Sequence, residues 1–275
     1  MKSFKLIFIS IVFSVLEVHG GEVQEIMPVP PQNYTRKRIT MKIVGGSPAR
    51  EHQFPWQASV TSCSGQSCST CGGSLISRRY ILTAAHCTAG LSEFQIGLGT
   101  NKRNKPTVNL ISKVKIEHPK YHARWLINDV SIIKLPRAVR LNKGVQIIPL
   151  ARKNETFNNR YATASGYGKT SSLSSVSDQL NYVDMRIISN TECKKTYGLS
   201  VQDSTLCAVG KNRASQNVCQ GDSGGPLVVK EGNSFVQVGV VSFVAKAGCE
   251  YGFPSGYARV SSFYPWIIRT ASRLL

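Results

Sequence analysis

The chain has 275 residues, which is enough for one large domain or two small ones with a buried core. Its hydrophobic content of 41% is ordinary for a soluble protein, and no segment has the length and apolar character needed to cross a bilayer. The formal charge of +19 favours polyanionic partners such as acidic glycans or anionic membranes, although it also fits a general contribution to solubility. Nucleic acid is not expected, because no basic run is interleaved with aromatic residues.

Residues 1–20 have the pattern of a secretion signal. Lys2 and Lys5 supply the positive start, residues 6–16 are almost wholly apolar, and Val18-His19-Gly20 offers small residues at the cut. We therefore expect a secreted, extracellular protein whose eight cysteines form disulfides.

Residues 21–42 are polar and proline-rich, which predicts a mobile propeptide. The segment ends at Lys42, directly before Ile43-Val44-Gly45-Gly46, so we expect a protease that cuts after basic residues to free Ile43. Beyond Lys42, 28 basic and 12 acidic residues leave a formal charge of +16. Asn33 and Asn154 each begin a glycosylation sequon, and Asn33 would leave with the propeptide.

From Gln53 onward the sequence predicts an all-β protein. Short alternating apolar runs are separated by Gly, Pro, Asn and Ser, as in Tyr80–Leu82, Val108–Ile116 and Phe235–Phe243. One helix is expected, over Tyr264–Leu275, because its apolar residues share one face. Many short strands with a single terminal helix favour a barrel architecture.

Three further motifs carry candidate chemistry. Ser223 lies in the run Cys-Gln-Gly-Asp-Ser-Gly-Gly-Pro, whose glycines allow backbone N–H groups to point at a developing oxyanion. A serine hydroxyl needs a base, which His86 in Leu-Thr-Ala-Ala-His-Cys could supply, and Asp129 could fix the imidazole tautomer. Taken singly, these residues could be a turn serine, a core histidine and a turn carboxylate. Their occurrence together beside Ile43 favours catalysis.

These four motifs resemble the chymotrypsin-like serine protease family, and the resemblance runs from Ile43 to the end of the chain. It implies a domain at 43–275 built from two six-stranded antiparallel β-barrels and a C-terminal helix. The chain would cross between the barrels near 141–159, and the active site would lie between them. It also implies a secreted endopeptidase, made as a zymogen, that needs no cofactor.

The family's functional residues map onto this sequence one by one. The implied roles are a triad of His86, Asp129 and Ser223, an oxyanion hole from the N–H groups of Gly221 and Ser223, a hydrogen bond from Ser242 to Asp129, and an ion pair between Asp222 and the freed ammonium of Ile43.

The resemblance also implies the disulfides Cys71–Cys87, Cys193–Cys207 and Cys219–Cys249. The remaining Cys63 and Cys68 are expected to pair at a hairpin tip, while a metal site of Cys63, Cys68 and Cys71 is the weaker alternative. Glu93 and Glu117 are too few acids for a calcium loop, so no metal is expected.

The substrate pocket departs from that of trypsins. Asn217 stands where trypsins carry aspartate, Val244 stands where wide pockets carry glycine, and Ser255 is uncharged on the other wall. The remaining substrate-binding residues implied by the family are Val218, Gln220, Ser242, Phe243 and Leu126. This pattern is closest to arthropod brachyurins, insect chymotrypsin-like enzymes and elastases, and predicts cleavage after uncharged, small to medium residues.

Two alternatives for specificity stay open. An outward bow of residues 245–248 would give chymotrypsin-like cleavage after Phe, Tyr and Leu, and an inward Glu250 would attract basic residues. A catalytically silent binding protein with a basic surface is the alternative function. The partners expected of an active enzyme are protein or peptide substrates, a trypsin-like activator, serpin-type or other protein inhibitors and acidic glycans.

Overall fold

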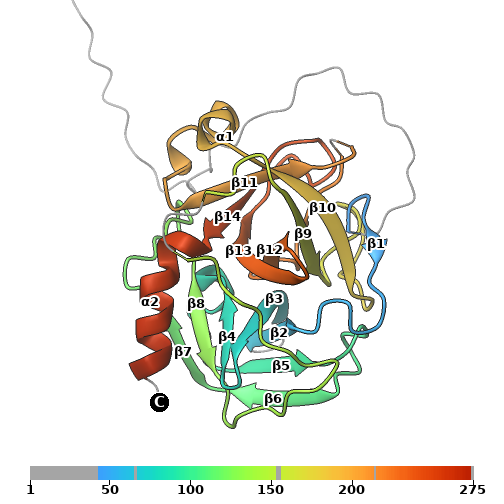
Figure 1. Cartoon of the computed structure of the whole chain (residues 1–275), viewed down its shortest axis with the longest axis vertical. Helices are drawn as coiled ribbons and strands as arrows, with labels where there is room; N and C mark the ends of the chain where they lie inside the picture. The colour runs from blue at the N-terminus through green and yellow to red at the C-terminus, as the bar shows by residue number, and fades with distance from the viewer. Residues whose placement is uncertain (1–42, 65–66, 153–155, 214, 274–275) are drawn as a thin grey trace, which may run out of the picture.

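The computed structural model describes residues 43–273, with gaps at 65–66, 153–155 and 214. The secretion signal, the propeptide with Lys42 and Asn33, and the sequon asparagine Asn154 lie outside the described residues. Two antiparallel sheets stack one above the other in Figure 1. Within the described residues no helix is long and apolar enough to cross a membrane.

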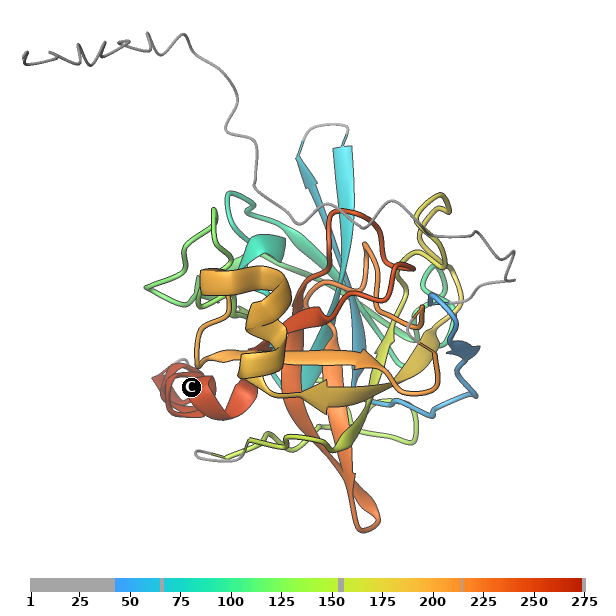
Figure 2. The same cartoon turned by 90° about the horizontal axis from the view of Figure 1, so that it is seen from above.

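The first half of the domain forms one curled seven-stranded sheet in the order β6-β5-β2-β3-β4-β8-β7. Its strands are β2 (Gln57–Ser64), β3 (Ser67–Ser77), β4 (Tyr80–Thr83), β5 (Phe94–Leu98), β6 (Val108–Ser112), β7 (Val114–Glu117) and β8 (Ser131–Lys134). The hairpin of β2 and β3 projects from the body in Figure 2.

The predicted strand Val108–Ile116 is broken in two at Lys113. The Ser112 hydroxyl donates to the Lys134 carbonyl at 2.6 Å and accepts from the Val114 N–H at 3.2 Å, which bends the chain between β6 and β7. Since β6 pairs with β5 and β7 pairs with β8, this bent segment joins both ends of the curled sheet.

The second half forms a closed barrel. Its sheet order is β1-β10-β11-β14-β13-β12-β9, and β9 also pairs with β10, so six strands close the ring and β1 adds at an edge. The strands are β1 (Ser47–Pro48), β9 (Tyr161–Gly166), β10 (Asn181–Ile188), β11 (Thr205–Gly210), β12 (Pro226–Glu231), β13 (Ser234–Phe243) and β14 (Ser255–Arg259). The expected all-β architecture of two barrel halves is confirmed, and the first half is a curled seven-stranded sheet where a closed six-stranded barrel was expected. The chain passes from one half to the other between Lys134 and Tyr161, a stretch that contains the crossing expected near 141–159.

Buried side-chain hydrogen bonds join the barrels. The Ser165 hydroxyl donates to Gln57 Oε1 at 2.7 Å, and the Ser74 hydroxyl donates to Gln237 Oε1 at 2.7 Å. Each pair has one residue from each sheet, so these bonds fix the position of one half relative to the other. This relative position matters because functional residues come from both halves.

Helix α2 (Val260–Arg273) begins a full turn before the predicted Tyr264. Val260 and Phe263 are buried and anchor this added turn. The Phe263 and Trp266 rings also contact the His118 ring at centroid distances of 5.4 and 5.1 Å, so the helix packs across to the first sheet (Figure 1).

A second helix, α1 (Asn190–Tyr197), was not predicted. The Ser189 hydroxyl accepts from the Glu192 N–H at 3.1 Å, which caps the N-terminus. A serine followed three residues later by glutamate is a known start signal, but the helix is short and polar and carries no clear apolar period. Two one-turn 3-10 helices lie at Ala85–Cys87 and Gly198–Ser200.

The cysteines pair as Cys63–Cys68, Cys71–Cys87, Cys193–Cys207 and Cys219–Cys249. This is the predicted set. Cys71–Cys87 joins β3 to the His86 turn, and Cys219–Cys249 joins the Ser223 loop to the segment after β13.

Arg259 offers a test of the packing. Its guanidinium donates to the Asp203, Thr156 and Thr205 carbonyls and to the Asn190 side chain at 2.8–3.1 Å. Arg259 itself is buried, and Arg259→Met would remove all four of these hydrogen bonds from a charged donor, so the free energy of unfolding should fall by about 3 kcal/mol or more.

The measurement is urea denaturation in a Ser223→Ala background, which prevents self-digestion. Arg269→Met, on the exposed face of α2, is the matched control and should change stability by less than about 0.5 kcal/mol. Equal stability of the two variants would mean that the Arg259 network does not support the fold.

Candidate active site

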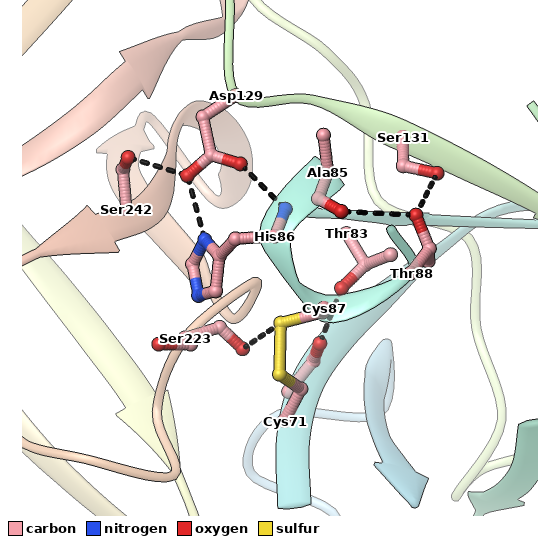
Figure 3. A network of polar contacts seen from close by, with 11 residues as sticks. Cys71, Thr83, Ala85, His86, Cys87, Thr88, Asp129, Ser131, Ser223 and Ser242 are labelled. Atoms are coloured by element: carbon pink, nitrogen blue, oxygen red, sulfur yellow. Dashed lines mark hydrogen bonds and ion pairs between the residues drawn. A yellow bond between two sulfur atoms is a disulfide. The ribbon is translucent and has the colours of Figure 1, made fainter. Parts of the chain in front are cut away.

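His86 lies in the 3-10 turn directly after β4 and is held at two points by Asp129. Its Nδ1 lies 2.7 Å from Asp129 Oδ2, and its backbone N–H donates to Asp129 Oδ1 at 2.9 Å (Figure 3). The network assigns the proton to Nδ1, which leaves Nε2 able to accept one. The His86 side chain is 25% exposed and that of Asp129 only 1%.

Asp129 is bound from both barrels. It lies just before β8, while Ser242 in β13 donates its hydroxyl to Asp129 Oδ2 at 2.6 Å. One carboxylate oxygen therefore accepts from the imidazole and from Ser242, and the other accepts from backbone. A buried carboxylate with this many donors stays oriented toward the ring.

Ser223 is half-buried on the loop before β12, and Figure 3 shows it on the side of the imidazole away from Asp129. The Ser223 carbonyl accepts from the Gly72 N–H at 2.7 Å, which fixes the loop against β3. Gly224 follows with φ of +78°, and a Cβ there would collide with Thr83 Oγ1. Only glycine both adopts this positive φ readily and leaves room for Thr83.

The N–H groups of Gly221 and Ser223 form a candidate oxyanion site. Within the described part of the chain neither donates to a protein acceptor. Gly221 has φ of +97°, and a Cβ there would lie 2.8 Å from Val176 and 3.0 Å from Gly168. The pair can therefore turn toward a carbonyl oxygen attached to Ser223.

Asp222 is fully buried beside Ser223. Its Oδ1 accepts from the Gly168 N–H at 2.8 Å, and its Oδ2 accepts from the Cys219 N–H at 2.9 Å. Burial raises the pKa of Asp222 to about 7, and these two hydrogen bonds oppose the rise. No ion pair to this carboxylate occurs among the described residues.

Ile43 is completely buried, and the two residues after it are hydrogen-bonded to the segment that precedes the Ser223 loop. The Asn217 N–H donates to the Val44 carbonyl at 3.1 Å, and Gln216 Nε2 donates to the Gly45 carbonyl at 2.8 Å. Ile43 has φ of +22°, a conformation that β-branched residues rarely adopt.

The predicted pocket floor is uncharged and hydrogen-bonded. Asn217 Nδ2 donates to the Phe253 carbonyl at 2.9 Å, and its Oδ1 accepts from the Val218 N–H at 3.0 Å. The Ser255 hydroxyl is bonded to Tyr257 at 2.9 Å and is fully buried. Neither Asn217 nor Ser255 offers a counter-charge for a basic substrate side chain.

The predicted walls lie around the Cys219–Cys249 disulfide. Val244 is half-buried and packs on the cluster of Val44, Cys219 and Cys249. The exposed Gln220 places its Oε1 3.0 Å from Cys219 Sγ. Phe243 packs against Gly256 and Tyr197, so α1, which the sequence analysis missed, supports this wall.

Leu126 and Glu250 lie at the margins. Leu126 has φ of +49° and lines, with Ser242 and Phe243, a cavity of about 10 Å³ behind Asp129. The Glu250 carboxylate accepts from the Ser172 N–H at 2.9 Å and from the Ser172 hydroxyl. Glu250 is thus held by the loop between β9 and β10. Ser172 carried no sequence signal for this role, because the partners lie far apart in the chain.

Cys71, His86 and Cys87 lie close enough together to resemble a metal site. The two sulfurs are bonded to one another, so they are not thiolate ligands. The cluster instead joins the His86 turn to β3.

Comparison with known proteins places these features in one family. The family model described as Trypsin matches residues 43–267. A trypsin delta of Drosophila erecta is 34% identical over 273 residues, covering 96% of this chain and 99% of that protein. Serine protease 1 of Drosophila melanogaster is 36% identical over 255 residues, 89% of each chain. A solved structure titled HL collagenase has a TM-score of 0.77 and 34% identity, and covers 84% of this chain and 99% of that one.

The reactivity of Ser223 tests the hydrogen bonds around His86. In protein beginning at Ile43, Asp129→Asn should slow labelling of Ser223 by a fluorophosphonate by about 10⁴-fold, because the imidazole loses its tautomer control. Glu231→Gln, an exposed change on the β12–β13 hairpin, should label at the original rate. Equal rates for the two variants would remove Asp129 from the mechanism.

Proposed function

Since the chain belongs to the trypsin family and is a serine endopeptidase that acts on proteins or peptides, we propose that it is secreted as a zymogen, is activated by cleavage after Lys42 and cuts after uncharged residues. The observation that carries the catalytic part is the double attachment of His86 to Asp129, with Ser223 on the opposite side of the ring.

In the proposed reaction, His86 Nε2 takes the proton of the Ser223 hydroxyl as its oxygen attacks the peptide carbonyl. The N–H groups of Gly221 and Ser223 stabilise the oxyanion, while Asp129 stabilises the imidazolium. His86 then protonates the leaving amine, and water releases the acyl group by the same steps in reverse. The family membership disfavours the silent binding-protein alternative, and the attachment of His86 to Asp129 supports the proposed triad.

Activation rests on Asp222. Among the residues that the structure describes, no cation pairs with this buried carboxylate, so its ionisation costs free energy. Cleavage after Lys42 would give Ile43 an ammonium group next to the same loop. Cleavage would also remove the restriction on the Ile43 φ angle, because that torsion requires the peptide bond to Lys42. Both effects stabilise the active conformation of the Ser223 loop only after cleavage at Lys42.

Specificity follows from the pocket floor and wall. A buried guanidinium or ammonium would find only amide and hydroxyl groups at Asn217 and Ser255, at a desolvation cost of several kcal/mol. Val244 adds two methyl groups where a flat ring would enter, and overpacking costs about 1–3 kcal/mol. Glu250 is engaged with Ser172, which supports the uncharged preference.

Comparing proteins with two different N-termini tests whether activation needs a free amine on Ile43 or only the removal of most of the propeptide. Protein beginning at Ile39 should be at least about 100-fold less active on a peptide substrate than protein beginning at Ile43, because its ammonium cannot reach Asp222. Lys42→Gln should block activation by trypsin, whereas Arg38→Gln should not. Equal activity from both N-termini would refute the role of Asp222.

A chromogenic panel with Arg, Phe, Leu and Ala on the acyl side of the cut measures specificity. Leu or Ala should give the highest kcat/KM, and Val244→Gly should raise the ratio of Phe to Ala by about tenfold. Highest activity on Arg would refute the pocket assignment. Highest activity on Phe in the unmodified enzyme would refute only the role of Val244.

A further inference from the structure

Four arginines gather at the end of the first sheet that lies away from the triad. Arg78 and Arg79 form the turn between β3 and β4, and Arg137 and Arg140 lie just after β8. We propose that this arginine patch, residues 78, 79, 137 and 140, is a docking site for a sulfated glycan chain.

The patch is preformed because its two segments are bonded to each other. The Leu135 N–H donates to the Arg79 carbonyl and the Val139 N–H to the Arg78 carbonyl, both at 2.8 Å. In return, Arg78 Nε donates to the Val139 carbonyl at 3.0 Å and Arg79 Nη2 to the Pro136 carbonyl at 3.1 Å. A rigid set of cations loses less conformational entropy on binding than a flexible one.

The charge of the patch is not compensated within the described residues. None of its four arginines takes part in an ion pair there, and Arg137 and Arg140 are exposed with no hydrogen-bond partner. The segments 74–83 and 130–150 that contain the patch have no acidic residue. Lys143 in the second segment is exposed and extends the basic surface.

The chemistry of the patch suits the sulfate groups of a glycan. Arginine presents a planar fork that binds tetrahedral oxyanions at two points, and it holds its charge at any physiological pH. Tyr80 is the only aromatic residue in the two segments, and it is buried. The patch therefore has no ring for stacking on nucleic-acid bases or for insertion at a bilayer interface.

The patch and the triad lie at opposite ends of the same two strands. β4 and β8 pair antiparallel, with Tyr80 opposite Lys134 near the patch and Thr83 opposite Ser131 near the triad. Four residues of strand span about 10 Å. A glycan bound at the patch would thus hold the enzyme while leaving the catalytic cleft open to substrate.

The test uses the full chain carrying Ser223→Ala and a fluorescent heparin dodecasaccharide. Arg137→Gln with Arg140→Gln should weaken binding about tenfold at 0.15 M salt and reduce the slope of log Kd against log salt by about 1.5. The matched control is Lys194→Gln with Lys195→Gln, two exposed cations on α1, which removes the same charge elsewhere. It should change the affinity little.

Three further probes test whether the patch prefers sulfated glycans to other polyanions. They are unsulfated hyaluronan, single-stranded DNA and vesicles with about 30% phosphatidylserine, an anionic content that attracts basic segments. The proposal predicts that only heparin binding depends strongly on the patch. Equal weakening by the patch and control variants would overturn it in favour of a general charge effect. A patch-dependent loss of vesicle or DNA binding as large as the loss of heparin binding, or larger, would also overturn it. Turnover of a small peptide substrate by the activated Arg137→Gln, Arg140→Gln enzyme should be unchanged.

Discussion

The buried carboxylate of Asp222 is the constraint on which the Ser223 loop depends. It accepts backbone hydrogen bonds from Gly168 and Cys219, and a Cβ at Gly166 or Gly168 would occupy its space. The loop that presents Ser223 is therefore shaped around a carboxyl group removed from water. Ionisation of this group requires a cation nearby, and in the proposed activation the freed amine of Ile43 would supply it.

The candidate active site also requires that the two barrels keep a fixed position relative to each other. His86 and Asp129 come from the first sheet, whereas Ser223 and Ser242 come from the second. The hydrogen bonds of Ser165 and Ser74 between the barrels, and the hydrogen bond from the Gly72 N–H to the Ser223 carbonyl, fix the relative position of the two halves that carry these groups. Catalysis of this kind needs groups placed within a fraction of an ångström, which explains why polar bonds are buried between the barrels.

Local alternation and turn residues predicted an all-β barrel protein, and glycine placement pointed to Ser223. The arrangement in two barrels and the disulfides Cys71–Cys87, Cys193–Cys207 and Cys219–Cys249 were predicted only through the resemblance to the family, because residues far apart in the chain form these contacts. The break at Lys113 and the Ser172–Glu250 bond were not predictable, since each depends on partners distant in the chain. Helix α1 was missed because its eight residues carry a cap at Ser189 but little apolar periodicity. The arginine patch likewise joins segments that are about 60 residues apart, as at Arg78 and Val139.

The pH dependence of stability before and after cleavage tests the account most directly. In the folded protein the pKa of Asp222 is raised to about 7, whereas in the unfolded chain it has its ordinary value of 3.8. Between these two values the folded protein keeps the proton on Asp222, and the unfolded chain has released it. The free energy of unfolding of the uncut Ser223→Ala protein should therefore fall as pH rises from 4 to 7, by on the order of a few kcal/mol relative to its Asp222→Asn variant. After cleavage at Lys42 the Ile43 ammonium should abolish this fall. The same pH dependence in cut and uncut protein would contradict the ion pair.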